Sequence, residues 1–262
     1  MAQAVFQRIE KKFMLTVQQY DALKLIIIKH MSPDQYTDYT ICNLYFDTEN
    51  FTLIRTSLEK PVYKEKLRLR SYGVPTDDTS VYLELKKKYK GIVYKRRIEL
   101  SMREAQVYLS EGRYPKQCSS QQILKEIDYT LHFYSCELQP VVFIAYDREA
   151  WAGKENPELR LTFDKNIRGR SKQLDLRAGD MGEPLLDADQ ILMEVKIPGA
   201  MPMWMAEALA ELNVTMSSFS KYGKWYQQNM AARVGRQMKL RALREAQTAR
   251  IAMNTERIRN YA

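Results

Sequence analysis

Seven segments of the chain alternate charged and apolar residues with a period of two, and this alternation constrains the fold more than any other feature. In residues 65–72, for example, every second residue from Lys66 to Arg70 is basic, and leucines lie between them. Successive side chains of a β-strand point to opposite faces, so each segment is expected to be a strand with one charged and one apolar face. Most of these charges are basic, and few small polar residues separate them.

Two arrangements of such strands are possible. A solvent-exposed face is the simplest explanation for any single strand, because antiparallel sheets commonly have one polar side. It explains the whole set less well, since like charges on neighbouring strands cost stability. A closed barrel would instead turn the charged faces into a lumen and leave the apolar faces to be covered by helices outside. A basic lumen of this kind suits a long phosphate polyanion, and a few Glu within it could hold Mg²⁺ or Mn²⁺.

The period-two segments, with the turn residues that bound them, predict about eight strands. They cover residues 6–15, 40–47, 65–72, 80–87, 92–101, 141–151, 159–164 and 190–198. Helical spacing predicts a helix over residues 16–29 with Thr16 as its N-cap, and further helices over 102–110, over 121–133 and from 203 onward, with a break near 213–215. Hairpin-like connections favour an α+β fold with a largely antiparallel sheet.

Several common kinds of site are not expected. Cys42, Cys118 and Cys136 form an odd, widely spaced set without a CxxC pair, and the two histidines are isolated, which disfavours zinc sites, disulfide frameworks and Cys/His nucleophiles. No GxxxxGK[ST] or GxGxxG motif offers a Gly-rich phosphate loop. The KKKYK run at 86–90 is better explained as a solvated hairpin rim than as a nucleic-acid patch, so no nucleic-acid partner is expected.

The net charge of +9 is concentrated near the C-terminal end, where the chain from Arg233 onward holds eight basic and two acidic residues. Its composition predicts one or two long helices. Three roles stay open for it: a solvated helix, a basic surface for an acidic membrane leaflet or a membrane-protein partner, and a guide for an emerging polyanion. The N-terminus lacks the apolar centre of a signal peptide and no apolar run is long enough to cross a bilayer, so we expect a cytoplasmic protein, at most peripheral at the inner face of a membrane.

Seven motifs resemble, in the same order, the vacuolar transporter chaperone (VTC) polyphosphate polymerase domain, a family of the triphosphate tunnel metalloenzymes. They are RIEKKF at 8–13, NLYFDT at 43–48, KLRLR at 66–70, YLELKKKYKGIVYKRR at 82–97, AYDREAW at 145–151, MEVKIPG at 193–199 and SSFSKY at 217–222. The resemblance implies an eight-stranded antiparallel tunnel barrel over residues 1–226, and it leaves 227–262 as a basic helical extension.

The resemblance also implies synthesis of polyphosphate from the γ-phosphate of ATP, with a divalent metal, Mn²⁺ or Mg²⁺. The basic residues that match the family's phosphate ligands are Lys12, Arg68, Arg70, Lys86, Lys95, Arg148 and Lys221. Tyr146 and Ser220 match its hydroxyl contacts, and Glu194 matches its metal carboxylate. Of these, Arg68, Arg70, Arg148 and Lys221 are the expected catalytic residues. Positions on the same strand faces add Lys66, Arg97 and Lys196 as phosphate ligands and Glu10 and Glu84 as metal ligands. Glu10 and Glu84 could equally be internal salt-bridge partners, and Tyr146 could be a core residue.

Three functions are compatible with these features. The related CYTH triphosphatases open with ExExK, and Arg8 stands here in place of the first Glu. One acid fewer favours the polymerase, whose partners would be ATP and inorganic polyphosphate. The alternatives are a tripolyphosphatase or nucleoside triphosphatase of the same tunnel fold and a non-catalytic polyphosphate-binding protein.

Overall fold

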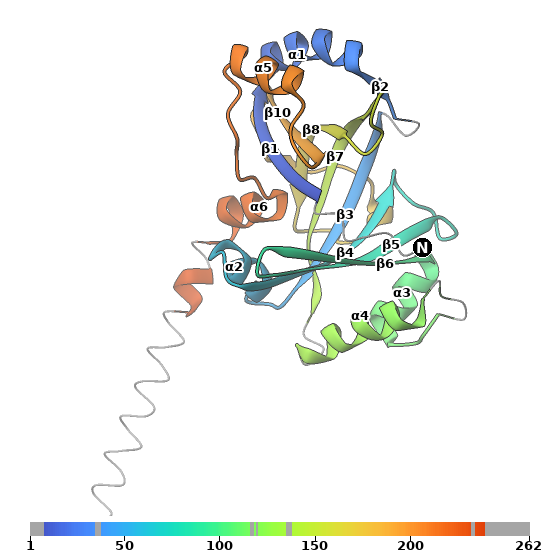
Figure 1. The fold of residues 1–262 in the computed structure, drawn as a ribbon. Helices are drawn as coiled ribbons and strands as arrows, with labels where there is room; N and C mark the ends of the chain where they lie inside the picture. The colour runs from blue at the N-terminus through green and yellow to red at the C-terminus, as the bar shows by residue number, and fades with distance from the viewer. Residues whose placement is uncertain are drawn as a thin grey trace, which may run out of the picture.

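One antiparallel sheet forms the centre of the protein, and helices cover it (Figure 1). The computed structural model describes residues 8–34, 38–115, 118, 120–134, 138–231 and 234–238. The strands are β1 Arg8–Thr16, β2 Met31–Pro33, β3 Tyr39–Asp47, β4 Tyr63–Tyr72, β5 Ser80–Tyr89, β6 Ile92–Ser101, β7 Gln139–Gly153, β8 Arg160–Arg170, β9 Glu183–Pro184 and β10 Gln190–Pro198. The helices are α1 Val17–His30, α2 Thr52–Leu58, α3 Met102–Glu111, α4 Gln121–Phe133, α5 Met203–Glu211 and α6 Lys221–Asn229, with a 3₁₀ turn at Leu176–Ala178.

The predicted α+β class and antiparallel pairing are confirmed, and the predicted closure of the barrel is wrong. The strand order is β1-β10-β8-β7-β3-β4-β5-β6, with β2 beside β7 and β9 beside β8. Within the described ranges, β1 and β6 end the sheet and do not pair with each other. Each half of the sheet buries its apolar face against its own helices, α3 and α4 on one half and α1 and α5 on the other, so both cores form without a ladder between β1 and β6.

Local sequence explains where most elements begin and end. Thr16 caps α1 as predicted. Its hydroxyl accepts a hydrogen bond from the backbone N–H of Gln19, and the Gln19 side chain accepts one from the backbone N–H of Thr16. By contrast, β8 continues beyond the predicted end at 164. Its second half does not alternate simply, since Asn166 has a φ of 49° and the β7–β8 register shifts between Ala145 and Asp147. Such a bulge interrupts the period-two pattern.

Two apolar clusters lie on the outer side of the sheet. Leucines of β3, β4 and β5 pack with α3 and α4, while β1, β7, β8 and β10 pack with α1 and α5. Figure 1 shows these two helix pairs at opposite ends of the molecule. Burial of the leucine face supplies the main stabilisation of each half, and it leaves the charged faces of the strands on the inner side.

A third cluster fills part of the inner side, where a wholly polar lumen was predicted. It joins Ile144 of β7 and Leu192 of β10 to Tyr222 and Trp225 of α6. Gly169 makes room for this helix, since a Cβ there would lie 2.9 Å from the Trp225 ring. The inner side of the sheet therefore carries an apolar area next to a charged one, and the charged area is called the groove below.

The C-terminal predictions are met only in part. Helix α6 is present and residues 234–238 are helical, whereas the predicted long helix and most of the basic extension fall at 239–262, outside the described residues. Among the helices of the described ranges, none is both long and apolar enough to cross a bilayer.

Candidate phosphate-binding groove

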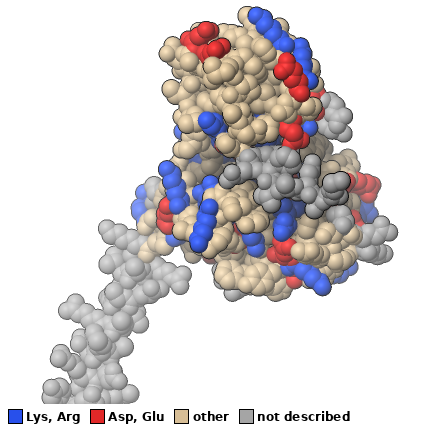
Figure 2. Space-filling view, in the orientation of Figure 1, with Lys and Arg blue, Asp and Glu red and all other residues tan. Residues whose placement is uncertain are grey.

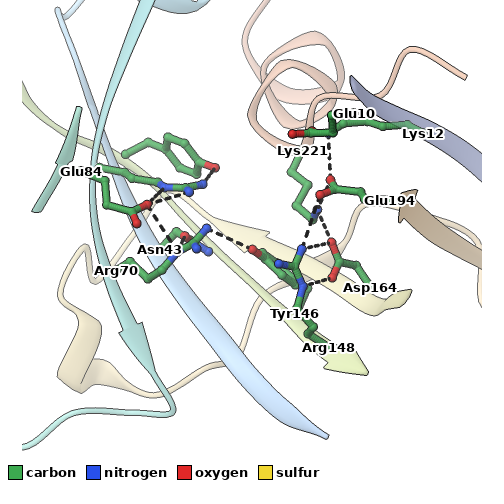
Figure 3. Close-up of polar contacts among 12 residues, drawn as sticks. Glu10, Lys12, Asn43, Arg70, Glu84, Tyr146, Arg148, Asp164, Glu194 and Lys221 are labelled. Carbon is green, nitrogen blue, oxygen red and sulfur yellow. Dashed lines mark hydrogen bonds and ion pairs between the residues drawn. The ribbon is translucent and has the colours of Figure 1, made fainter. Parts of the chain in front are cut away.

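Charged side chains from eight elements meet on the inner side of the sheet and form two groups that face each other (Figure 3). One group surrounds Asp164 and Glu194 and comes from β1, β7, β8, β10 and α6. The other surrounds Glu84 and comes from β4, β5 and β6. In Figure 2, Lys and Arg side chains are visible near the middle of the molecule, between the half that carries α1 and α5 and the half that carries α3 and α4.

Asp164 of β8 is the centre of the first group. Its carboxylate is fully buried and accepts two hydrogen bonds from Arg148, at 2.6 and 2.7 Å, and a third from Lys221 at 2.5 Å. Burial alone would raise the pKa of Asp164, but the charges of Arg148 and Lys221 outweigh it and lower this pKa. Asp164 thus fixes the positions of two buried cations.

Glu194 of β10 extends this group toward β1. Lys12 lies opposite Glu194 in the β1–β10 pairing, and its Nζ lies 2.8 Å from one carboxylate oxygen. The same carboxylate lies 3.4 Å from Lys221 and 3.6 Å from Arg148. Although burial opposes ionisation, these three cations hold the pKa of Glu194 well below its usual value. Two carboxylates therefore share three cations in a weakly screened site.

The first turn of α6 adds donors to the groove. Ser220 is the N-cap of this helix, and its hydroxyl accepts hydrogen bonds from the Gly223 N–H at 3.2 Å and from Lys66 at 3.0 Å. Burial, followed by the positive charge of Lys86, lowers the pKa of Lys66 to about 7. Lys66 can therefore gain a proton when an anion enters, because an adjacent negative charge favours its charged form.

Glu84 of β5 is the centre of the second group. It is buried and lies near the end groups of four cations, at 2.7 Å from Arg68, 2.9 Å from Lys95, 3.5 Å from Arg97 and 3.7 Å from Arg70. These cations overcome the effect of burial and lower the pKa of Glu84. One negative charge shared among four positive ones leaves a local excess of positive charge.

Arg70 and Tyr146 connect the two groups. Arg70 donates to the Asn43 side chain at 3.0 Å and to the Tyr146 hydroxyl at 3.3 Å, and Lys221 Nζ lies 4.3 Å from the centre of the Tyr146 ring. Burial opposes ionisation of the phenol, but the charges of Arg70, Arg148 and Lys221 lower the pKa of Tyr146. Tyr146 is thus a polar member of the groove as well as part of the inner core.

Comparison with protein-family models shows a match to the VTC domain over residues 7–230. The chain belongs to the VTC domain family. A search of curated proteins finds no match.

Among the solved structures that share the fold of this VTC domain are two proteins described as putative cyclases. A putative adenylate cyclase from Bacillus halodurans has 15% sequence identity and a TM-score of 0.53, and the match covers 86% of this chain and 97% of that one. A putative adenylyl cyclase from Hippeastrum, described as having a dominant triphosphatase activity, has 16% identity and a TM-score of 0.50, with the same coverage. At these identities the comparison concerns the fold alone.

The residues expected to bind phosphate line the groove of this VTC domain, but they are not equally enclosed. Arg70, Tyr146 and Lys221 are buried, whereas the Lys95 side chain is 47% exposed and Lys86 is exposed. Asp164 is missing from the expected set. Asp164 follows Thr162 by two residues, so the alternation of charged and apolar residues correctly assigns it to the charged face of its strand. Nothing in the sequence indicates its two cationic partners.

The expected metal ligands do not lie at one place. The described part of the chain holds no cluster of three or more His, Cys, Asp or Glu side chains. In the β1–β10 pairing Glu10 lies opposite Lys196 and Glu194 lies opposite Lys12, so the two carboxylates are diagonal to each other. Lys12 contacts both, at 3.7 Å from Glu10 and 2.8 Å from Glu194. One or two carboxylates plus phosphate oxygens suffice for Mg²⁺ or Mn²⁺, so Glu10 and Glu194 fit such an ion in the place that Lys12 takes between them. Glu84 lies in the other group, among four cations and apart from this pair.

Proposed function

We propose that this protein is a polyphosphate polymerase that transfers the γ-phosphoryl group of ATP to the end of an inorganic polyphosphate chain. The observation that carries the proposal is the excess of cations over carboxylates in the groove, where Asp164, Glu194 and Glu84 each contact two or more Lys or Arg side chains. Such a surface favours a ligand with many negative charges in a row.

The two groups suggest two ends of one binding path. Arg148 and Lys221 are held in place by Asp164, and Arg68 is held by Glu84 at 2.7 Å and by the Tyr45 hydroxyl at 3.2 Å. Cations that are already oriented need little reorganisation when phosphate arrives, which is the condition for electrostatic stabilisation of a transition state. We infer that donor and acceptor phosphates meet between these groups, beside Arg70 and Tyr146.

The proposed reaction conserves phosphoanhydride bonds. A terminal oxygen of the polyphosphate chain attacks the γ-phosphorus, a new P–O bond forms, and the bond from the γ-phosphorus to the bridging oxygen breaks. The electron pair of that bond stays with ADP. The attacking oxygen is already ionised, so no general base is required, and the groove acts by alignment and charge stabilisation. A divalent ion held by Glu194 and Glu10 would supply Lewis-acid stabilisation of the same negative charge.

A triphosphatase is the second candidate, because the similar Hippeastrum structure is described with that activity. Hydrolysis needs the same phosphate contacts with water as the acceptor. It also needs a group that accepts a proton from water. The cations around Glu84, Asp164 and Glu194 lower the basicity of these three carboxylates, whereas Lys66, with a pKa lowered to about 7, is a base that hydrolysis could use. The polymerase needs no such base, because its acceptor is already ionised.

Phosphorus NMR of the full chain tests the proposal. Purified protein is incubated with ATP and Mn²⁺, with and without a short polyphosphate primer, and ³¹P spectra follow the products. Growth of the internal-phosphate signal together with ADP supports the polymerase.

Two outcomes would contradict the polymerase. Orthophosphate and ADP without internal phosphate would establish the hydrolase instead. Unchanged ATP, together with tight binding of polyphosphate, would leave a binding protein. The variant Arg148→Ala serves as the inactive control, since contaminating enzymes would not respond to it.

A further inference from the structure

A cluster of aromatic rings lies on the charged side of the sheet, next to the second group of cations. Tyr39 of β3, Tyr72 of β4 and Tyr82 of β5 contact one another in sequence, with ring centres 5.4 and 5.6 Å apart in edge-on arrangements. Tyr82 lies opposite Arg70 in the β4–β5 pairing, so the cluster adjoins the phosphate-binding residues. The rings also reach solvent, since Tyr72 is 43% exposed.

Arg97 of β6 connects this aromatic cluster to the cations. Its guanidinium carbon lies only 3.5 Å from the centre of the Tyr82 ring, and it donates a hydrogen bond to the Tyr72 hydroxyl at 3.2 Å. On its other side it lies 3.5 Å from Glu84. A guanidinium at that distance from a ring centre is stacked on the ring.

Arg97 lies on a strand at the end of the described sheet, and its side chain reaches solvent. Strand β6 is the last strand in the sheet order, so no further described strand pairs with its outer edge. The Arg97 side chain is 35% exposed although Tyr82, Tyr72 and Glu84 restrain it. A planar cation that is fixed and yet exposed can stack with a second π-system.

We infer that Arg97, Tyr72 and Tyr82 form the binding surface for the nucleobase of a nucleoside triphosphate whose phosphates occupy the groove. The inference rests on the proposed function, because it takes a nucleotide as the phosphoryl donor. Stacking tolerates different bases, so this surface distinguishes a nucleotide from inorganic polyphosphate rather than one base from another. It gives the two substrates different ends of one path: the nucleotide enters beside β6, and the polymer lies toward Asp164 and Glu194.

The experiment compares the affinities of ATP and inorganic tripolyphosphate for the full chain by isothermal titration calorimetry. Arg97→Lys keeps the positive charge near Glu84 but removes the planar group, and Tyr72→Leu removes an aromatic face without changing the charge. Each variant should weaken ATP binding about three- to tenfold. Because Arg97 also belongs to the cations around Glu84, the readout for Arg97→Lys is the ratio of the two affinities, which should shift about threefold against ATP. Tyr72→Leu leaves the cations in place, so it should also keep tripolyphosphate within about twofold of the wild type, since only ATP carries a base to stack.

The matched control is Arg96→Lys. Arg96 is the neighbouring residue on the same strand but pairs with Glu126 of α4 at 2.7 Å, on the outer side, so both affinities should stay at the wild-type values.

Two results would overturn the inference. Equal weakening of both ligands by Arg97→Lys would make Arg97 a phosphate ligand and nothing more. Unchanged ATP binding in both Arg97→Lys and Tyr72→Leu would mean that the base binds elsewhere. Failure of the wild type to bind either ligand is a separate result, and it would refute the proposed function itself.

Discussion

Replacing Asp164 with Asn tests whether this carboxylate holds the cations of the groove in place. The substitution keeps the size of the side chain and removes its charge, so Arg148 and Lys221 lose their closest acceptor, at 2.5 to 2.7 Å. Breaking a buried ion pair usually costs about 3–5 kcal/mol. Glu194 lies within 3.6 Å of both cations and compensates in part, so we expect the lower end, about 3 kcal/mol.

Thermal unfolding at pH 7 measures this effect. In a protein of this size, about 3 kcal/mol corresponds to a fall in Tm of about 6–12 °C. Polyphosphate synthesis, measured below the unfolding transition, should fall about 10- to 100-fold because Arg148 is no longer oriented. The control is Asp78→Asn, whose side chain is 91% exposed and whose loss should change stability by less than about 0.5 kcal/mol.

The pH dependence gives a second check. Because the folded-state pKa of Asp164 is lowered, its contribution is complete above the unfolded value, near 4, and is lost as the pH falls through the folded pKa. The Tm difference between wild type and Asp164→Asn should therefore shrink in acid. A variant with the wild-type Tm and activity at pH 7 would refute the view that Asp164 orients the cations.

Three further substitutions test other parts of the structure. Lys66 has a lowered pKa of about 7, so above this pH the folded state binds fewer protons than the unfolded state. In urea unfolding, the stability of the wild type should therefore rise relative to that of Lys66→Met between pH 7 and 9. A constant difference between the two proteins would contradict this. Burial, followed by the charge of Arg148, lowers the pKa of Lys196 more than Glu10 and Glu194 raise it, so the charged form is disfavoured in the folded state. Lys196→Met should therefore keep or raise Tm while weakening tripolyphosphate binding in calorimetry, and a clear fall in Tm would contradict this. Thr16→Ala removes the α1 cap and should cost about 1 kcal/mol in urea unfolding with unchanged activity, because the cap lies outside the groove.

Local pattern was sufficient to predict most of the secondary structure. The bounds of β6, β10 and α4 agree with the predictions, because period-two and helical spacing depend only on which side of each element is buried. Helix α2 was not predicted. It spans only seven residues, and buried Asp47 of β3 accepts hydrogen bonds from its Leu53 and Ile54 N–H groups, which is a contact that periodicity does not reveal.

The sequence alone determined which residues share the charged face, since alternation along a strand fixes the side of each one. The positions of Lys12, Arg148 and Glu194 within their strands were therefore enough to assign them to the inner side. Only the tertiary structure decided which of them meet, because pairing across strands depends on strand order, register and the position of α6. Those long-range choices brought Asp164 beside Arg148 and Lys221, separated Glu84 from Glu194, and left β1 and β6, within the described ranges, without a ladder between them. The chemistry of the groove depends on these distances, and no local pattern in the chain records them.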